Sequence, residues 1–196
     1  ALPILGWKEF FGFRQKRRDP DPGGSHEDRS APVTELTLAD LQVGYMLDYD
    51  MKTWEVTAHH HYDWGDGDLS YEWQLKSADD TLYLEKSSDD EDEWCVCRPV
   101  PFSRLGGHVR SHIQAHEDPP DEIAFEGTTY HLDEFGGGKF FRNGKGPGRE
   151  FLVWDYEDDA GERFLSIEQW DEDDFEAFIG IFAEEYQFSN ILPRSG

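Results

Sequence analysis

The chain has 196 residues, a formal net charge of −25 and a mean hydropathy of −0.77. A surface this acidic repels nucleic-acid phosphates, which excludes a general nucleic-acid-binding function and favours cationic partners, or a halophilic source. Aromatic residues make up 15% of the sequence, and large rings bury enough area to support one compact domain or two small lobes on a shared core.

The first 18 residues differ in composition from the rest, with five basic residues and one acidic residue. Their apolar residues are only partly spaced for one helical face, yet the pattern favours a short apolar and basic helical segment. The segment is too short to cross a bilayer of ~30 Å, so we expect it to lie on an anionic membrane surface or to dock on a protein partner. The residues expected to make this contact are Ile4, Trp7, Phe10, Phe11, Arg14, Lys16, Arg17 and Arg18.

Residues 19–35 have the Pro, Gly and polar content of a flexible linker, and residues 37–41 then predict one helical turn or a loop. From Val43 onward the periodicity is mainly that of short strands, so we expect an all-β, mainly antiparallel fold. Four residues, 175–178, fit a short helix or a strand equally well. The predicted strands are 46–49, 53–57, 72–75, 82–84, 94–97, 122–125, 129–132, 151–156, 164–168 and 179–183.

Residues 43–97 and 122–178 share an ordered series of aromatic landmarks. Trp54 and Tyr130 lie 76 positions apart, whereas Trp73 and Trp154 lie 81 positions apart. The extra residues fall in the Gly-rich stretch 136–148, which predicts a longer hairpin loop. The pattern predicts two tandem β-meanders, packed as a sandwich or as a pair of half-barrels so that each covers the apolar face of the other. The corresponding segments are a first repeat at 36–105, a linker at 106–120 and a second repeat at 121–193.

The landmarks Gly44, Trp54, Trp73 and Tyr83 resemble those of the bacterial domain of unknown function 4178 family. The second half, with FLVWDYED from residue 151 and EEYQFSNILP from residue 184, is similar to the C-terminal part of that family. The resemblance covers roughly residues 36–193 and implies no established activity, catalytic residue or cofactor. Members of the family look like soluble proteins. Some are encoded beside genes for membrane-stress and polyamine-related proteins, and this gene neighbourhood implies a function associated with the cell envelope.

Histidines offer two weak metal candidates. His108 and His112 are four residues apart, a spacing that allows a shared metal on a helix, although a solvated linker explains this segment equally simply. His59 and His61 would share one face of a strand, beside an Asp- and Gly-rich stretch that is typical of a hairpin loop. The sequence therefore assigns no catalytic, cofactor-binding or metal-binding residue.

Cys95 and Cys97 would lie on one face of a strand, too close in sequence for an easy disulfide, which favours a reducing cytoplasm. A basic island of Lys139, Arg142, Lys145 and Arg149 is typical of an exposed hairpin tip. It also suits docking on an acidic neighbour, such as a second copy of the chain in a homo-oligomer.

These observations favour a non-enzymatic binding or scaffold module in the cytoplasm or at the inner-membrane surface, in an envelope-stress setting. Its partner would be a protein or the membrane, contacted through residues 1–18. One alternative is a metal-dependent enzyme that uses His59 and His61 or His108 and His112. The second alternative is a polyamine- or cation-binding regulator, which is suggested by the net charge of −25.

Overall fold

A computed structural model of the chain describes residues 36–88 and 92–193. Residues 1–18 and 19–35, predicted as anchor and linker, lie outside the described residues. The prediction of a mainly antiparallel β fold is confirmed, because eleven strands form one sheet and all of its pairs are antiparallel.

The strands of the first half are β1 (Met46–Tyr49), β2 (Lys52–Gly65), β3 (Asp68–Lys76), β4 (Thr81–Ser88) and β5 (Asp92–Val100). Those of the second half are β6 (Glu122–Phe125), β7 (Thr128–Phe141), β8 (Arg149–Asp158), β9 (Arg163–Asp171), β10 (Asp174–Ala183) and β11 (Ser189–Leu192). The helical elements are η2 (Leu38–Asp40), η3 (Phe102–Leu105), α1 (Gly107–His116), η4 (Arg142–Gly144) and η5 (Glu185–Gln187).

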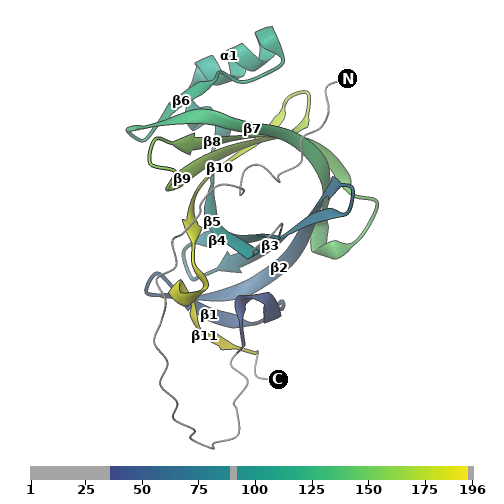
Figure 1. The fold of residues 1–196 in the computed structure, drawn as a ribbon, viewed down its shortest axis with the longest axis vertical. Helices are drawn as coiled ribbons and strands as arrows, with labels where there is room; N and C mark the ends of the chain where they lie inside the picture. The colour runs from purple at the N-terminus through teal and green to yellow at the C-terminus, as the bar shows by residue number, and fades with distance from the viewer. Residues whose placement is uncertain (1–35, 89–91, 194–196) are drawn as a thin grey trace, which may run out of the picture.

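The sheet closes into a ring of eight strands (Figure 1). Neighbouring strands follow the order β11-β1-β2-β3-β4-β5-β10-β9-β8-β7-β6, so β5 and β10 join the two halves at one seam. At the other seam β2 pairs with β7, through Tyr62 opposite Phe140 and Asp63 opposite Lys139. The halves therefore share one continuous sheet, with β1 and β11 added beyond β2 and with β6 added beyond β7.

A β-bulge in β2 changes which side chains face the ring interior. Val56 pairs with Leu75 and Ala58 with Gln74, which leaves Thr57 as an extra residue. Strand side chains alternate between faces, so one extra residue inverts the alternation. Val56 consequently lies in the apolar core outside the ring, whereas Tyr62 lies inside it.

A bulge of the same kind interrupts β7. Leu132 pairs with Tyr156 and Glu134 with Asp155, so Asp133 is the extra residue. Leu132 packs against the core outside the ring, while Phe140, farther along the strand, lines the ring interior. In the first part of both β2 and β7, the core residues are therefore the outward-facing ones, such as Val56 and Leu132, whereas in the last part Tyr62 and Phe140 line the cavity inside the ring.

The apolar outer face of each half is covered by a connecting segment. On the first half, η2 and the segment around β11 pack over Trp54 and Trp73. On the second half, η3 and α1 supply Phe102, Leu105, Val109 and Ile113. The expectation that each half covers the apolar face of the other is therefore wrong. The reason is that ring closure turns these faces outward in opposite directions, and α1 lies against the outer side of the second half (Figure 1).

Every predicted strand falls within an observed strand, and residues 175–178 belong to β10. The predicted hairpin loop at 136–148 is wrong in its first part, because Gly136–Phe141 continue β7. Gly138 lies where β7 meets β2, and a Cβ atom there would lie 2.7 Å from the carbonyl oxygen of Asp63. Glycine is therefore present because the ring seam brings two backbones together, and the loop itself is confined to residues 142–148.

Candidate functional site

The interior of the ring holds a cavity of ≈ 400 Å³. Carboxylates, aromatic rings and bases line it together, from both halves of the chain. The acidic and aromatic lining residues are Glu72, Glu168, Glu176, Tyr62, Tyr83, Phe140, Trp170 and Phe178. Arg142, Lys145 and Arg149 line the opening, which we call the mouth, beside His60. A smaller enclosed space continues behind Tyr62, Glu168 and Phe178, with Glu85, Cys95 and Asp155 in its wall.

Four carboxyl groups form an acidic cluster inside the ring: Glu72, Asp155 and Glu168, which are buried, and Glu85, which is partly buried. Burial raises the pKa of Glu85 and that of Asp155 to about 7. Burial, followed by repulsion from Glu85, raises the pKa of Glu72 well above its ordinary value. Burial, followed by repulsion from Glu72 and Glu85, does the same to the pKa of Glu168. The cluster is therefore poorly able to carry its full charge unless a cation enters.

Neutral groups satisfy part of the acidic cluster. The phenol of Tyr62 donates a hydrogen bond of 3.0 Å to Glu72. The thiol of Cys97 donates a weak hydrogen bond of 3.4 Å to Glu85, and Ser166 bonds to Asp155. Glu168 is only 8% exposed, yet it has no hydrogen-bond partner among the residues that the structure describes. A buried carboxyl group without a partner is costly, so Glu168 marks the point where the cavity lacks a ligand group.

Aromatic rings form the wall between the acidic cluster and the mouth. The ring of Phe140 packs edge-on against Trp170 at 5.5 Å and lies tilted against Tyr62 at 5.1 Å. Trp170 also lies under the guanidinium of Arg149, at 5.0 Å. The indole Nε1 of Trp170 is buried and has no hydrogen-bond partner among the described residues. The wall thus offers π faces for a cation.

The loop after β7 is held at the mouth by His60. The backbone N–H of Asn143 donates a hydrogen bond of 2.9 Å to Nδ1 of His60. Burial, with a smaller effect of the Arg142 charge, lowers the pKa of His60 to about 4. The imidazole is therefore neutral near pH 7, as an acceptor must be. This contact fixes η4, and with it Arg142, beside the cavity.

The sequence-based histidine candidates lie elsewhere. His59 and His61 do share a face of β2, but it is the outer face, where His59 stacks on Trp73 at 4.7 Å and His61 on Phe141 at 4.6 Å. His108 and His112 lie on α1, and Nδ1 of His112 is 2.9 Å from the carbonyl oxygen of Asp118. Within residues 36–88 and 92–193, no group of three or more His, Cys, Asp or Glu side chains has the arrangement of a metal site.

The basic island is divided by the structure. Arg142, Lys145 and Arg149 line the mouth, while Lys139 points to Glu150, with its Nζ 3.5 Å from the carboxylate. Cys95 and Cys97 share one buried face of β5, as expected from strand alternation, and both are free thiols. Residues 1–18 lie outside the described residues, so their predicted contacts stay predictions.

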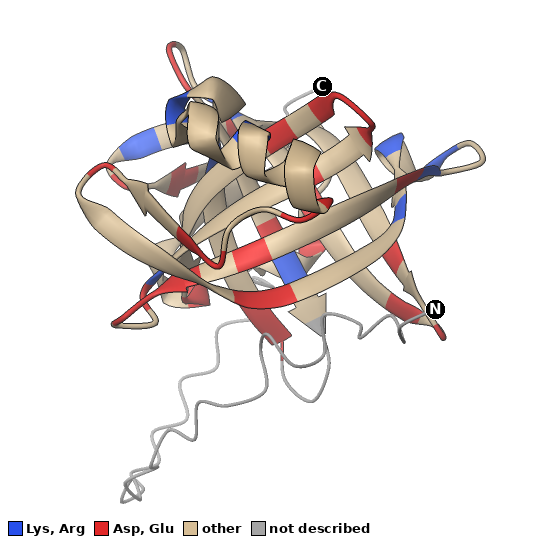
Figure 2. Cartoon of the chain, turned by 90° about the horizontal axis from the view of Figure 1, so that it is seen from above, with Lys and Arg blue, Asp and Glu red and all other residues tan. Residues whose placement is uncertain are grey.

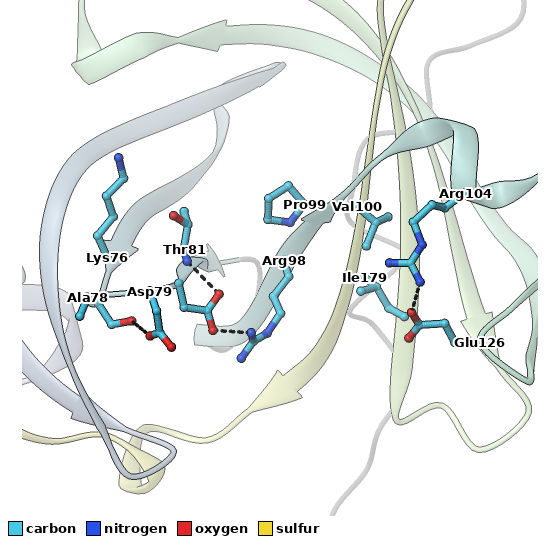
Figure 3. A pocket seen from close by; sticks show the side chains of 12 residues that line it. Lys76, Ala78, Asp79, Thr81, Arg98, Pro99, Val100, Arg104, Glu126 and Ile179 are labelled. Carbon is cyan, nitrogen blue, oxygen red and sulfur yellow. Dashed lines mark hydrogen bonds and ion pairs between the residues drawn. The ribbon is translucent and has the colours of Figure 1, made fainter.

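A second cavity is an open groove of ≈ 700 Å³ beside the β5–β10 seam. Four of its charged side chains form two ion pairs with one another (Figure 3), whereas Asp79 pairs with Lys52 outside the groove and Lys76 forms no ion pair among the described residues. Arg98 lies 2.6 Å from Asp80, and Arg104 lies 2.6 Å from Glu126. Because these groups satisfy each other in the open groove, the interior cavity is the better candidate for a ligand site.

Sequence reasoning missed the acidic cluster because acids are abundant in this chain. Asp and Glu occupy many loops and strand positions at the surface, which conceals the few that are buried (Figure 2). One local signal could have found them. Glu72 stands between Tyr71 and Trp73, and Asp155 between Trp154 and Tyr156, so each acid alternates with core aromatics inside a predicted strand.

Comparison with known proteins adds a family but no activity. Residues 42–185 match the model of a family described as domain of unknown function (DUF4178). An uncharacterized protein of Aquifex aeolicus (strain VF5) is 27% identical over 168 residues, which cover 86% of this chain and 92% of that protein. No solved structure matches the chain. None of the helices in the described ranges is long and apolar enough to cross a membrane.

Proposed function

Because this chain belongs to the DUF4178 family, whose description assigns no activity, we propose from its interior cavity that the domain is a binding module for a small organic cation. The observation that carries the proposal is Glu168, a buried carboxyl group that lines the cavity and has no hydrogen-bond partner among the described residues. An ammonium group beside it would supply the missing partner and would favour the charged form of the whole acidic cluster.

The walls of the cavity support an organic cation in particular. Tyr62, Phe140 and Trp170 present aromatic rings to the same space, and aromatic faces attract alkylammonium groups by about 0.5–2 kcal/mol. The volume of ≈ 400 Å³ falls in the range of about 300–1,000 Å³ that is usual for small-molecule sites. This is the cation-binding alternative of the sequence analysis, now assigned to particular residues.

Calorimetric titration of the full chain with cadaverine and with spermidine tests the proposal. We expect binding that releases protons near neutral pH, because a bound ammonium lowers the pKa values of the acidic cluster. The released protons are measured as a dependence of the binding enthalpy on the ionisation enthalpy of the buffer. Glu168→Gln should weaken binding roughly 10-fold or more, since it removes a buried charge partner.

The matched control is Glu172→Gln, which removes one negative charge from an exposed turn residue outside the cavity. Its affinity should equal that of the wild type. Equal weakening by both substitutions would assign the binding to the acidic surface as a whole and overturn the proposal. Failure of the wild type to bind any amine would overturn it as well.

We also propose that the two halves arose as a duplicated β-meander, arranged as a pair of half-barrels. Supporting this, β1–β5 and β6–β10 have the same order of pairing, and the extra residues Thr57 and Asp133 are 76 positions apart, like Trp54 and Tyr130. An experimental structure in which the two halves superpose with both bulges aligned would support duplication, and bulges out of register would contradict it.

The role proposed for residues 1–18 is separate from the cavity. Their composition supports attachment of the binding module to an anionic membrane or to a partner protein. Co-sedimentation with anionic and neutral vesicles, for the full chain and for a chain lacking residues 1–18, tests it. Sedimentation of the full chain alone, with anionic vesicles alone, is the expected result; equal behaviour of both chains would reject the anchor.

A further inference from the structure

We propose that the ligand of the interior cavity is zwitterionic, with its ammonium end inside the ring near Glu168 and an anionic end at the mouth near Arg142 and Lys145. This inference rests on the proposed function and narrows the class of ligand. It would give the cavity two ends of opposite charge, each matched to one end of the same small molecule.

The charges at the mouth are opposite to those expected for a simple cation site. The chain carries 43 acidic and 18 basic residues, so an acidic opening would be the default for this protein. Yet the exposed side chains that line the cavity containing the acidic cluster include three bases, Arg142, Lys145 and Arg149, against one acid, Glu176. A free diamine would have to pass these positive charges, and its outer ammonium would stay close to them. A ligand with an anionic outer end meets no such repulsion.

Two of the three bases, Arg142 and Lys145, are free to form an ion pair with a ligand. The guanidinium of Arg149 forms an ion pair with Asp174 at 2.7 Å and lies over the Trp170 ring, so its charge is already paired within the protein. Arg142 and Lys145 make no ion pair within the part of the chain that the structure describes. Guanidinium and ammonium groups at the rim of a partly enclosed site are good donors for a carboxylate or phosphate.

The position of these donors is fixed by the backbone. Asn143 is tied to His60, and this contact holds the η4 turn that contains Arg142 against β2. On the inner side, Glu72 and Glu168 are fixed on β3 and β9 by the ring itself. The anionic and cationic halves of the site therefore belong to rigid elements, which favours ligands of a particular length.

Matched pairs of probes test the inference in the full chain. The ω-amino acids γ-aminobutyrate, δ-aminovalerate and ε-aminocaproate are compared by calorimetry with the diamine and the monoamine of corresponding chain length. Phosphoethanolamine provides a phosphate in place of the carboxylate. We expect at least one zwitterion to bind roughly 10-fold or more tightly than its matched diamine.

The variants Arg142→Gln and Lys145→Gln should each weaken binding of that zwitterion roughly 5-fold, whereas binding of the monoamine should not weaken, because a repulsive charge is removed. Lys139→Gln is the matched control, because Lys139 belongs to the same basic stretch but pairs with Glu150 and does not line the cavity. It should not change the affinity. Preference for phosphoethanolamine over the ω-amino acids would identify phosphate as the anionic group.

Two outcomes would overturn the inference. Tighter binding of every diamine than of its matched zwitterion would reject the anionic end while leaving the proposed cation-binding function intact. Equal losses of affinity in the Lys139 and Arg142 variants would show that the mouth acts only through the overall charge of the surface. Absence of binding by all amines, zwitterions included, would reject the proposed function itself.

Discussion

Nδ1 of His60 accepts a hydrogen bond of 2.9 Å from the backbone N–H of Asn143, which joins two residues 83 positions apart in the chain. His60 lies on β2, in the first half, and Asn143 lies in the turn that follows β7, in the second half. The bond therefore crosses the β2–β7 seam, and it ties the mouth to the ring at a point next to Arg142.

Replacing His60 by Phe should loosen this turn. The substitution keeps an aromatic ring but removes the acceptor of this part-buried hydrogen bond, which should cost about 0.5–1.5 kcal/mol. Hydrogen exchange of the Asn143 amide should accelerate, and the urea midpoint should fall. His61→Phe is the control, because His61 stacks on Phe141 outside the ring. If exchange at Asn143 accelerates equally in both variants, the hydrogen bond does not hold the turn.

The ligand-free domain should be more stable at mildly acidic pH than at alkaline pH. Burial raises the pKa of Glu85 and that of Asp155 to about 7, so the folded state holds more protons than the unfolded state between about pH 4 and about pH 7. The stabilisation from Glu85 and Asp155 is complete at pH values below the pKa values that these groups have in the unfolded chain, and it is lost as the pH rises through about 7. His60, with its pKa lowered to about 4, and His59, whose pKa is also lowered by burial, have the opposite effect as pH falls below about 6.5, whereas the raised pKa values of Glu72 and Glu168 act in the same direction as those of Glu85 and Asp155.

Urea unfolding at about pH 5 and about pH 8 measures the difference, which should amount to a few kcal/mol. Glu85→Gln removes one of the raised pKa values and should flatten the dependence. A wild type that is more stable at the higher pH would contradict the burial of these carboxyl groups in the folded state.

Deleting Thr57 should prevent the native fold. Without the extra residue, the alternation of β2 would stay in phase, and Tyr62 and His60 would exchange faces with His59 and His61. The milder change Thr57→Val removes only the hydrogen bonds that the Thr57 hydroxyl donates to the side chain and to the backbone carbonyl of Gln74, at 2.9 Å and 3.2 Å, and should cost about 1 kcal/mol. Circular dichroism melting distinguishes the two, and a cooperative transition for the deletion variant near that of the wild type would reject a fixed register.

Gly180→Ala should destabilise the domain by about 1–3 kcal/mol through overpacking. Gly180 lies between β5 and β9, where a Cβ atom would overlap the ring of Phe164 and lie 2.7 Å from the carbonyl oxygen of Val96. Shortening Phe164 to Leu in the same chain should recover part of the loss. Gly107→Ala, in open space at the start of α1, should be neutral or slightly stabilising. Similar losses at both glycines would exclude a steric cause.

The sequence was sufficient to predict which segments form strands but not where their side chains point. Trp73 and Trp154 are landmarks of the repeat pattern, which predicts that such aromatic residues pack in a core, and both are buried. The bulges at Thr57 and Asp133 were not predictable, because an extra residue in a strand leaves no mark in composition or periodicity. The sequence therefore predicts that His59 and His61 share a face of the strand, but it does not predict that His60, on the opposite face, lies beside the cavity.

The sequence also does not predict which connecting segments pack over the outer faces of the sheet. Val109 and Ile113 are buried on α1, but the surrounding histidines and the Pro119-Pro120 pair are typical of a solvated linker. The interior cavity depends on the pairing of β2 with β7, a contact between residues about 80 positions apart that no local pattern reports. Glu72 and Glu168 could therefore be placed in strands from the sequence, yet they could not be placed together.

The two outer cores place much of the apolar packing of the domain outside the interior cavity. Most proteins of this size depend on one central core, so a charged group at the centre threatens the whole fold. Here Trp54 and Trp154 belong to separate apolar clusters outside the ring. Relatives could exchange the acids, aromatics and bases of the cavity for others and keep the same framework, so one architecture could serve many different ligands across the family.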